Sequence, residues 1–331
     1  MENIDIVIPW VDGGDPEWQK SFKEFTPNPE LSDSKFERYR DWDLLKYWFR
    51  GVEQYAPWVR KIHFITCGQT PSWMNTNNPK LNLINHSDYI EHSLLPVFSS
   101  HPIELPIHKI KDLAEHFIYF NDDFFLIDDV DEIDFFTNSL PNDSAIMNPV
   151  SGGDPMMLHV AINNLDCINR NFKKHDVIKG ALPKWFSHKY NKGGLYKNAV
   201  LLPWPNFPGF LDHHLPQPYL KKTLDDAWAK ERTYLEKTLS SKFRSISDVN
   251  MYLFRYWQLC KGDFYPTDLK KLGKYFDLTD ESVDAISDHI IKGESKVIVV
   301  NDGEVKDFES TKENLIQAFQ KRLPRKSSFE L

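Results

Sequence analysis

Short apolar runs that alternate with helical patterns most constrain the fold of this chain. The runs occupy residues 4–11, 59–66, 80–86, 116–127, 144–150 and 295–302. Between the first two, residues 41–55 place apolar side chains at helical spacing, with Asp41 as the expected N-cap. Strand–helix–strand alternation is typical of a sheet whose strands are joined by crossover helices. We therefore expect an α/β fold.

The stretch from 151 to 290 departs from this alternation. Glycine pairs and prolines mark loops up to about residue 222, and residues 222–260 then carry helical patterns. After the last apolar run, a helix with Ser310 as its expected N-cap follows. We expect three segments: an α/β core (1–150), a loop-rich and helical acceptor or lid region (151–290), and a strand and helix that complete the core (291–331).

Acidic side chains follow or interrupt three of the apolar runs. Asp12 and Asp15 come after the first run, Asn121-Asp122-Asp123 break the fourth, and Asn301-Asp302 end the last. Ligands of open α/β sheets bind outside the carboxyl ends of the strands. Mg²⁺ and Mn²⁺ bind there through one or two carboxylates plus substrate phosphates. The pattern predicts such a cation site, and a turn with solvated aspartates remains the alternative.

Arginines that precede helices are candidates for holding phosphate. Arg38 and Arg40 lie ahead of the helix at 41–55, and Arg244 lies ahead of a later helical pattern. Guanidinium groups and helix N-termini both favour anions. A surface salt bridge is the competing interpretation for each arginine.

Histidines in loops are candidates for proton transfer. His213 and His214 occupy a proline-bounded loop, and His101 lies near Glu104. A loop histidine titrates near neutral pH and can deprotonate an attacking hydroxyl. A partly buried structural histidine is the alternative at each position.

Composition narrows the class of protein. The chain has 331 residues and a formal charge of −8, which argues against a surface that coats nucleic acid. Aromatic residues make up 14%, a level found in large cores and in proteins that hold sugar rings or bases. Three widely spaced cysteines suggest a reducing compartment with buried thiols, and neither a signal peptide nor a membrane-spanning run is apparent. We expect a cytoplasmic protein, with association at the inner face of the cell membrane left open.

Four regions of the chain, in order, resemble the conserved regions of the Stealth proteins. "IDIVIPWVDGGDPEW" is similar to the first, and the second runs from "RYRDWDLLKYWFRG" through "LPVFSSHPIE" to "HFIYFNDDFFL". The stretch from "HHLPQPYLKKTLDDAW" through "FRSISDVNMYLFRYWQL" looks like the third region. The last 37 residues, from "SKVIVVNDGEVKDF", look like the fourth.

The resemblance implies both an activity and a fold. Stealth proteins include bacterial capsular and exopolysaccharide phosphotransferases, so we expect transfer of a sugar-1-phosphate from a UDP-sugar to an acceptor hydroxyl, with release of UMP. The implied acceptor is an oligosaccharide or a lipid-linked saccharide, and Mg²⁺ or Mn²⁺ is the implied cofactor. The implied fold is a nucleotide-sugar-binding sheet of the glycosyltransferase-A kind with an inserted, mostly helical subdomain.

The resemblance also implies roles for individual residues. His214 is the preferred general base, and the other implied catalytic residues are Arg40, Arg244, Asp122 and Asp248. Asp122 and Asp123 are the implied metal ligands. The implied donor-binding residues are Trp10, Asp12, Gly13, Asp15, Asp41, Asn121, Asn301 and Asp302. His101 stands where some members have proline, so no role is carried over to it.

Two other functions are weighed against this one. A metal-dependent glycosyltransferase would use the same donor but release UDP. A carbohydrate-binding module would use the aromatic residues as stacking platforms, but it would not need arginines and carboxylates on separate loops. The identity of the released nucleotide separates the two enzymes.

Overall fold

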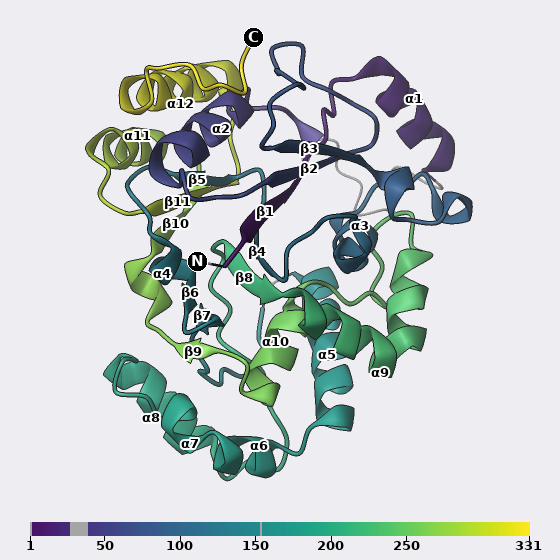
Figure 1. The fold of residues 1–331 in the computed structure, drawn as a ribbon, viewed down its shortest axis with the longest axis vertical. Helices are drawn as coiled ribbons and strands as arrows, with labels where there is room; N and C mark the ends of the chain where they lie inside the picture. Colours follow the sequence, from purple (N-terminus) through teal and green to yellow (C-terminus); the bar gives the residue numbers. More distant parts are fainter. Residues whose placement is uncertain (1, 27–38, 153) are drawn as a thin grey trace.

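A computed structural model describes residues 2–26, 39–152 and 154–331 (Figure 1). Arg38, predicted above as an anion-binding residue, lies outside the described residues. The α/β class predicted from the sequence is confirmed, because a parallel sheet is covered by helices on both faces.

The central sheet has five strands in the order β3-β2-β1-β4-β8. The first four are parallel, and β8 runs antiparallel to β4. Nearly all residues of the middle strands are buried, as expected for strands covered on both faces. The strands are β1 (Ile4–Pro9), β2 (Ile62–Thr66), β3 (Leu81–Asn85), β4 (His116–Tyr119) and β8 (Gln217–Leu220).

The strand order reverses direction at β1. The chain passes from β1 outward to β2 and β3, and then crosses to the other side of β1 to form β4. The loops that follow β1 and β4 therefore flank a crevice at the carboxyl edge of the sheet. In open α/β sheets this is the usual position of a ligand.

The apolar run 116–127 is not one strand, as the sequence had suggested, but two strands in different sheets. Its first half is β4, and its second half is β5 (Phe124–Leu126), which pairs antiparallel with β11 (Val297–Asp302). β11 also pairs in parallel with β10 (Gly273–Leu278), which gives a second sheet in the order β10-β11-β5. Residues 121–123 are the link between the two sheets, so the polar break has a topological cause.

The expected strand at 144–150 is also not found. A small third sheet contains β6 (Phe136–Thr137), β7 (Leu140–Asp143) and β9 (Tyr265–Pro266), and β7 ends just before this segment. The segment instead makes an isolated antiparallel bridge, between Met147 and Phe210, with the Leu211 amide donating to the Ile146 carbonyl. Two of its amides donate to side chains: that of Ala145 to the Tyr190 hydroxyl, and that of Met147 to Asn198 Oδ1.

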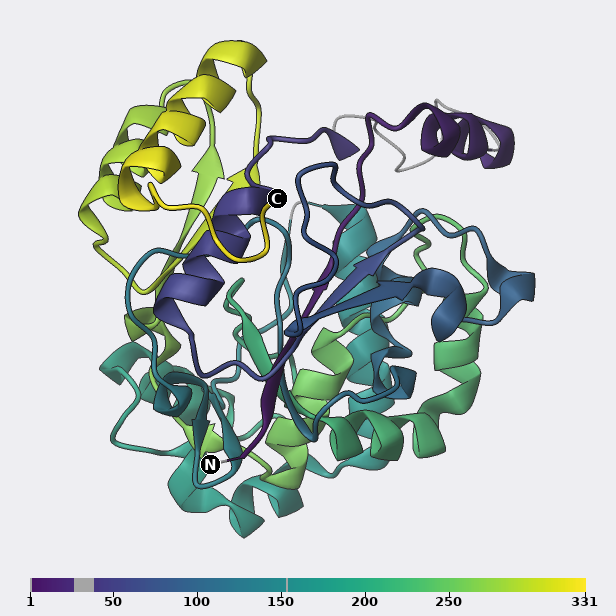
Figure 2. The same ribbon diagram turned by 45° about the horizontal axis from the view of Figure 1, so that its top comes forward.

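Helices cover the two faces of the central sheet. On one side α2 packs against β5, α11 packs against β10 and α12 packs on α11, so these helices also cover the second sheet; on the other side lie α3, α5, α9 and α10 (Figure 2). The α-helices are α1 (Pro16–Phe25), α2 (Leu45–Tyr55), α3 (Ser100–Glu104), α4 (Glu132–Phe135), α5 (Pro155–Asn171), α6 (Lys174–Gly180), α7 (Leu182–Trp185), α8 (Lys192–Leu201), α9 (Lys221–Leu239), α10 (Tyr252–Lys261), α11 (Val283–Lys292) and α12 (Phe308–Arg322). Short 3-10 turns lie at His86–Asp88, His92–Leu94, Ile107–Lys109 and Leu269–Lys271.

Two predicted N-caps are wrong. Leu44 precedes α2 without a side-chain cap, because the Asp41 carboxylate instead accepts from the amide of Asp43, whose φ is +55°. α12 is capped by Asp307, which accepts from the Ser310 amide, so the helix starts two residues before Ser310.

Residues 151–290 are mostly helical, yet they also contribute β8 to the central sheet and β10 to the second sheet. The boundaries at residues 150 and 290 therefore do not separate the sheets from the helices. The division into domains at these residues stays a prediction. In the part of the chain that the structure describes, none of the helices is both long and apolar enough to cross a bilayer.

The C-terminal segment packs against the core, with the Arg50 guanidinium donating to the Glu330 carboxylate and the Leu331 amide donating to the Trp73 carbonyl. Cys167 and Cys260 are buried, as expected, whereas Cys67 is exposed, so the expectation of three buried thiols is wrong for that residue.

Candidate active site

A cavity of about 520 Å³ lies where β1, β4 and β11 end. We call it the main cavity. It gathers most of the residues singled out from the sequence, although they come from distant parts of the chain. Those residues are Trp10, Arg40, Asp41, Asn121, Asp122, Asp123, His214, Arg244, Asn301 and Asp302.

The loop after β1 contributes Trp10 to the main cavity, whereas its acidic residues serve local structure. The Asp12 carboxylate accepts from the Gly14 amide at 2.7 Å, and Asp15 caps α1 by accepting from the Trp18 amide at 2.9 Å. Gly13 is required because a Cβ there would lie 2.0 Å from the Tyr39 carbonyl oxygen. None of the three is among the residues that line the main cavity.

The loop after β4 is different, because its carboxylates are left with little compensation. Asp123 Oδ1 is buried without a hydrogen-bond partner among the described residues. Loss of hydration, followed by the charge of Asp123, raises the pKa of Asp122 to about 7. The negative charge of these two adjacent carboxylates is therefore incompletely balanced.

A divalent metal fits this donor set. No group of three or more histidine, cysteine or acidic side chains within the described ranges is arranged to hold a metal alone. Mg²⁺ does not require one, because it usually binds one or two carboxylates and completes its shell with water and substrate phosphates. The unpartnered oxygen of Asp123 and the raised pKa of Asp122 mark the place where such an ion would relieve repulsion.

The charge of the main cavity is unbalanced. Five carboxylates line it, from Asp41, Asp122, Asp123, Asp154 and Asp302, against two arginines. Asp154 was not predicted; it caps α5 by accepting from the Met156 amide, and the Asp-Pro pair before a helical pattern was its only signal in the sequence. This acidic lining would repel a phosphorylated ligand, and a cation bound beside the ligand would offset that repulsion.

The two arginines that line the main cavity differ in the partners of their side chains. Arg40 makes a two-pronged ion pair with Asp302, with N–O distances of 2.8 and 2.6 Å. No hydrogen bond or ion pair of the Arg244 side chain occurs within residues 2–26, 39–152 and 154–331. Arg244 is therefore a cation available to an anionic ligand in this cavity.

Asp248, expected to contribute with Arg244, lies outside the cavity and is fully buried. Its carboxylate accepts from the Ser241 hydroxyl at 2.7 Å, the Ser245 amide at 2.9 Å, and faces His101 Nδ1 at 3.1 Å. These bonds span Arg244 in the sequence, so Asp248 holds the loop that presents the guanidinium. Through its contact with Asp248, His101 has a structural role in supporting that loop.

His214 stands at the edge of the main cavity. Its Nε2 lies 3.7 Å from Asp123 Oδ2, and its ring meets Phe124 and Tyr275 edge to face. Its side chain is 38% exposed, so a ligand can reach it. His213 is a poor alternative as a base, because burial lowers its pKa to about 4.

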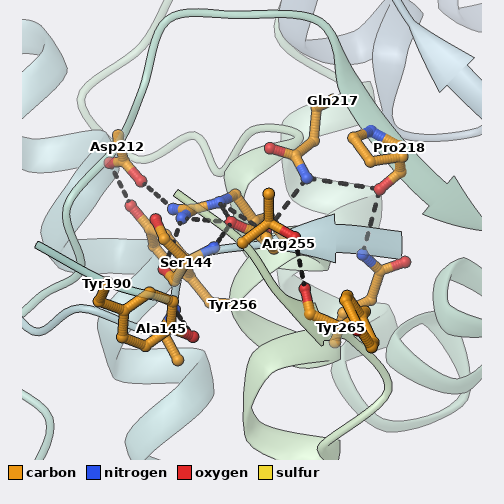
Figure 3. A network of polar contacts seen from close by, with 12 residues as sticks. Ser144, Ala145, Tyr190, Asp212, Gln217, Pro218, Arg255, Tyr256 and Tyr265 are labelled. Atoms are coloured by element: carbon orange, nitrogen blue, oxygen red, sulfur yellow. Dashed lines mark hydrogen bonds and ion pairs between the residues drawn. The ribbon is translucent and has the colours of Figure 1, made fainter. Parts of the chain in front are cut away.

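A buried ion pair holds the loop that carries His214. Arg255 on α10 lies at the centre of this network, beside Asp212 and Tyr256 (Figure 3). Its guanidinium donates to Asp143 at 2.8 Å and to Asp212, two residues before His214, at 2.7 Å. The Tyr256 hydroxyl also donates to Asp212, at 2.6 Å. Sequence reasoning missed Arg255; its signal was an arginine inside the apolar helix "MYLFRYWQL".

Two further cavities adjoin the main one. The aromatic cavity, about 240 Å³, shares Trp10, Asn121, Asp122 and Arg244 with it and is lined in addition by Trp18, Tyr39, His86, Phe98, Glu104 and Phe243. The lysine cavity, about 560 Å³, lies on the other side of His214 and is lined by Asp212, His213, His214, Leu215, Lys270, Gly273, Lys274 and Tyr275. His214 and Arg244 thus stand at the two junctions.

Sequence comparison identifies the relatives of this chain. Models of Stealth conserved regions 1 and 2 match residues 2–28 and 38–143. A capsular polysaccharide phosphotransferase WcwK of Streptococcus pneumoniae is 40% identical over 100% of this chain and 98% of the relative. The receptor polysaccharide phosphotransferase WefC of Streptococcus oralis is 37% identical over the whole of both chains.

A further relative and a solved structure complete the comparison. The exopolysaccharide phosphotransferase cps2G of Lactiplantibacillus plantarum is 35% identical over 99% of this chain and 96% of the relative. The apo structure of the bifunctional glycosyltransferase WbbM aligns with a TM-score of 0.39 at 12% identity, over 97% of this chain and 52% of that one. A likeness at that level carries no argument about fold, so the glycosyltransferase-A kind of sheet stays a prediction. The full-length relatives show that the chain is a transferase and belongs to the Stealth family.

Proposed function

We propose that this enzyme transfers a sugar-1-phosphate from a UDP-sugar to a hydroxyl of an acceptor saccharide, in capsular or exopolysaccharide synthesis. The names of the full-length relatives support phosphotransfer in polysaccharide synthesis. One observation carries the proposal: a single cavity contains both the available Arg244 guanidinium and the carboxylates of Asp122 and Asp123, whose negative charge is incompletely balanced.

The two adjoining cavities suggest how the donor lies. The aromatic cavity offers flat apolar side chains to a nucleobase, among them those of Trp18, Phe98 and Phe243. Its junction with the main cavity, at Asp122 and Arg244, then receives the diphosphate. The sugar extends into the main cavity toward His214.

Asp122 and Asp123 would hold Mg²⁺ or Mn²⁺ together with the donor phosphates. The ion would neutralise charge on the diphosphate and on departing UMP. Arg244 contributes charge on the other side of the phosphates, since no carboxylate among the described residues pairs with its guanidinium. Arg40 is already paired with Asp302, so it acts on the donor through that pair or by exchanging partners.

The acceptor enters from the lysine cavity in this proposal. His214 lines both that cavity and the main one, which supports its role as the group beside an incoming hydroxyl. The acceptor oxygen bonds to the phosphorus that carries the sugar, and its proton passes to His214. The bond from that phosphorus to the bridging oxygen breaks, and the electron pair leaves on UMP. The sugar keeps its anomeric oxygen throughout.

Release of the nucleotide tests the proposal. The enzyme is incubated with Mg²⁺, UDP-sugars and a short oligosaccharide, and UMP is separated from UDP. Acceptor-dependent UMP supports attack at phosphorus. Acceptor-dependent UDP would instead assign a metal-dependent glycosyltransferase, and release of neither nucleotide from any donor would remove the proposed substrate class.

A further inference from the structure

Residues 172–206 differ in charge from the rest of the molecule. They contain seven lysines and one acidic residue, Asp176, in a chain whose formal charge is −8. The segment includes α6, α7 and α8 and lies at the end of the molecule opposite α11 and α12 (Figure 1). We call it the basic lobe.

Large apolar side chains of the basic lobe are exposed. Tyr196 is 71% exposed, Trp204 54%, Leu182 50% and Val200 48%. On α8 the positions 192, 196 and 200 follow each other at a spacing of four and share one face, which is exposed. The face that carries Gly194, Asn198 and Leu201 is buried. The helix therefore turns a lysine, a tyrosine and a valine outward together.

Hydrogen bonds anchor the segment that carries these exposed side chains. The Asn198 amide donates to the carbonyls of Ala145 and Trp185, both at 2.7 Å. Lys174 is buried, and its ammonium donates to the carbonyls of Leu201 and Trp204. These bonds anchor both the buried face of α8 and the turn that carries Trp204, so Tyr196, Val200 and Trp204 are exposed on an ordered part of the chain.

We propose that the basic lobe binds the surface of a bilayer that contains anionic lipids. Tyrosine and tryptophan favour the headgroup level, where one end of the side chain is apolar and the other is wet. Lysines near an anionic surface add attraction. A soluble polyanion would also attract the lysines, but the exposed aliphatic side chains of Leu182 and Val200 favour a bilayer, because they gain only from an apolar environment.

The rest of the molecule makes such binding oriented. Outside the basic lobe the chain is more acidic than the whole, so an anionic surface repels the remainder of the molecule on balance. Ten residues separate Trp204 from His214, which limits their separation to about 35 Å. A lobe on the membrane would therefore hold the lysine cavity within reach of an acceptor that is attached to lipid.

Vesicle sedimentation tests this proposal without any activity assay. Vesicles of phosphatidylglycerol and phosphatidylcholine are compared with vesicles of phosphatidylcholine alone, at low and at high salt. We expect binding to the anionic vesicles only, weakened by salt. The double change Lys179→Gln and Lys192→Gln should weaken binding roughly 25-fold, at about fivefold for each lysine.

Matched variants locate the contact. Trp204→Ser with Tyr196→Ser should weaken binding at high salt more than the lysine changes do, because the apolar contribution is not screened. The controls Lys230→Gln with Lys237→Gln, on the exposed face of α9, and Ile133→Ser, an exposed apolar side chain elsewhere, should bind as the unchanged protein does.

Three results would overturn the proposal: no binding to anionic vesicles at low salt, equal binding to neutral vesicles, or equal loss in the control variants. Binding of a soluble glycerol phosphate oligomer through Lys179 and Lys192, without vesicle binding, would assign the lobe to a polyanionic saccharide instead. The variants should keep nucleotide release with a soluble acceptor, so this proposal can fail while the proposed chemistry stands.

Discussion

The loop after β1 and the loop after β4 carry almost the same signal in the sequence but have different surroundings in the fold. Each places acidic residues at the end of a buried strand. Asp12 and Asp15 accept hydrogen bonds from the amides of Gly14 and Trp18. Asp123 Oδ1 has no partner within the described residues, and the pKa of Asp122 is raised to about 7. The comparison teaches that the carboxylates left without compensation are the ones available for a ligand.

The largest expected effect comes from Arg244, the cation that lines the same cavity as these carboxylates. Arg244→Ala should lower kcat for UMP release by about 10³–10⁵-fold, the range found when an arginine that stabilises a transferring phosphoryl group is lost. Arg244→Lys should recover only part of the activity, because an ammonium cannot make the two-pronged contact. Near-normal turnover of Arg244→Ala would show that the roles in the cavity are wrongly placed.

The two loops can be compared directly with one kind of substitution. Asp122→Asn should reduce kcat by about 10²–10³-fold, as the loss of an electrostatic contact to the reacting group does, and it should weaken Mg²⁺ binding in calorimetry. Asp12→Asn should change either quantity less than about threefold, because an amide oxygen can still accept the Gly14 bond. Equal effects of the two changes would erase the distinction between the loops.

Removal of the proposed base should cost less than removal of Arg244. A general base contributes about 10²–10⁴-fold, and a loose phosphoryl transition state needs little activation of its nucleophile. We expect His214→Ala to fall at the lower end of that range and to keep trace activity above background. His213→Ala, assayed in parallel, should retain more activity than His214→Ala. The reverse order would move the base to His213.

A substitution at Gly13, in the loop after β1, should change the stability of the protein rather than its activity. Gly13→Ala brings a methyl group within 2.0 Å of the Tyr39 carbonyl, so the two segments must separate. Forced contacts of this kind cost about 1–3 kcal/mol. A lower unfolding midpoint in denaturant is expected, and Gly152→Ala, where a Cβ would meet nothing within 4 Å, is the control. Equal midpoints for the two variants would mean that the loop relaxes freely.

These contrasts show what the sequence could and could not predict. The apolar runs located β1, β2, β3 and β11, because a buried strand leaves a local signal. The division of 116–127 between two sheets left no such signal, since both halves are equally apolar. The partners that distinguish Asp12 from Asp122 depend on the folded chain, and so does the pairing of Arg255 with Asp143 and Asp212.

The smallest expected effect comes from an unpartnered polar atom of His108, which is not among the residues that line these cavities. His108 Nδ1 is buried without a partner in the described part of the chain, and burial lowers the pKa of His108 to about 4. Its unfolded form takes up a proton below about pH 6.5, whereas the folded form does so only near pH 4. Its contribution to stability is therefore complete above pH 6.5 and is lost as the pH falls toward 4.

His108→Gln should flatten that loss without changing UMP release at pH 7.5. Denaturant unfolding at pH 7 and at pH 5 measures the change. A pH dependence identical to that of the unchanged protein would mean that His108 does not supply it. A change in UMP release would mean that a residue outside the cavities also affects the reaction.

The position of bond cleavage tests the central claim most directly. A UDP-sugar labelled with ¹⁸O at the anomeric oxygen is turned over with Mg²⁺ and an oligosaccharide acceptor, and the products are weighed by mass spectrometry. We predict that the label remains in the saccharide product, between the sugar and phosphorus, while unlabelled UMP is released. Label in released UDP would place the attack at the anomeric carbon and contradict phosphotransfer.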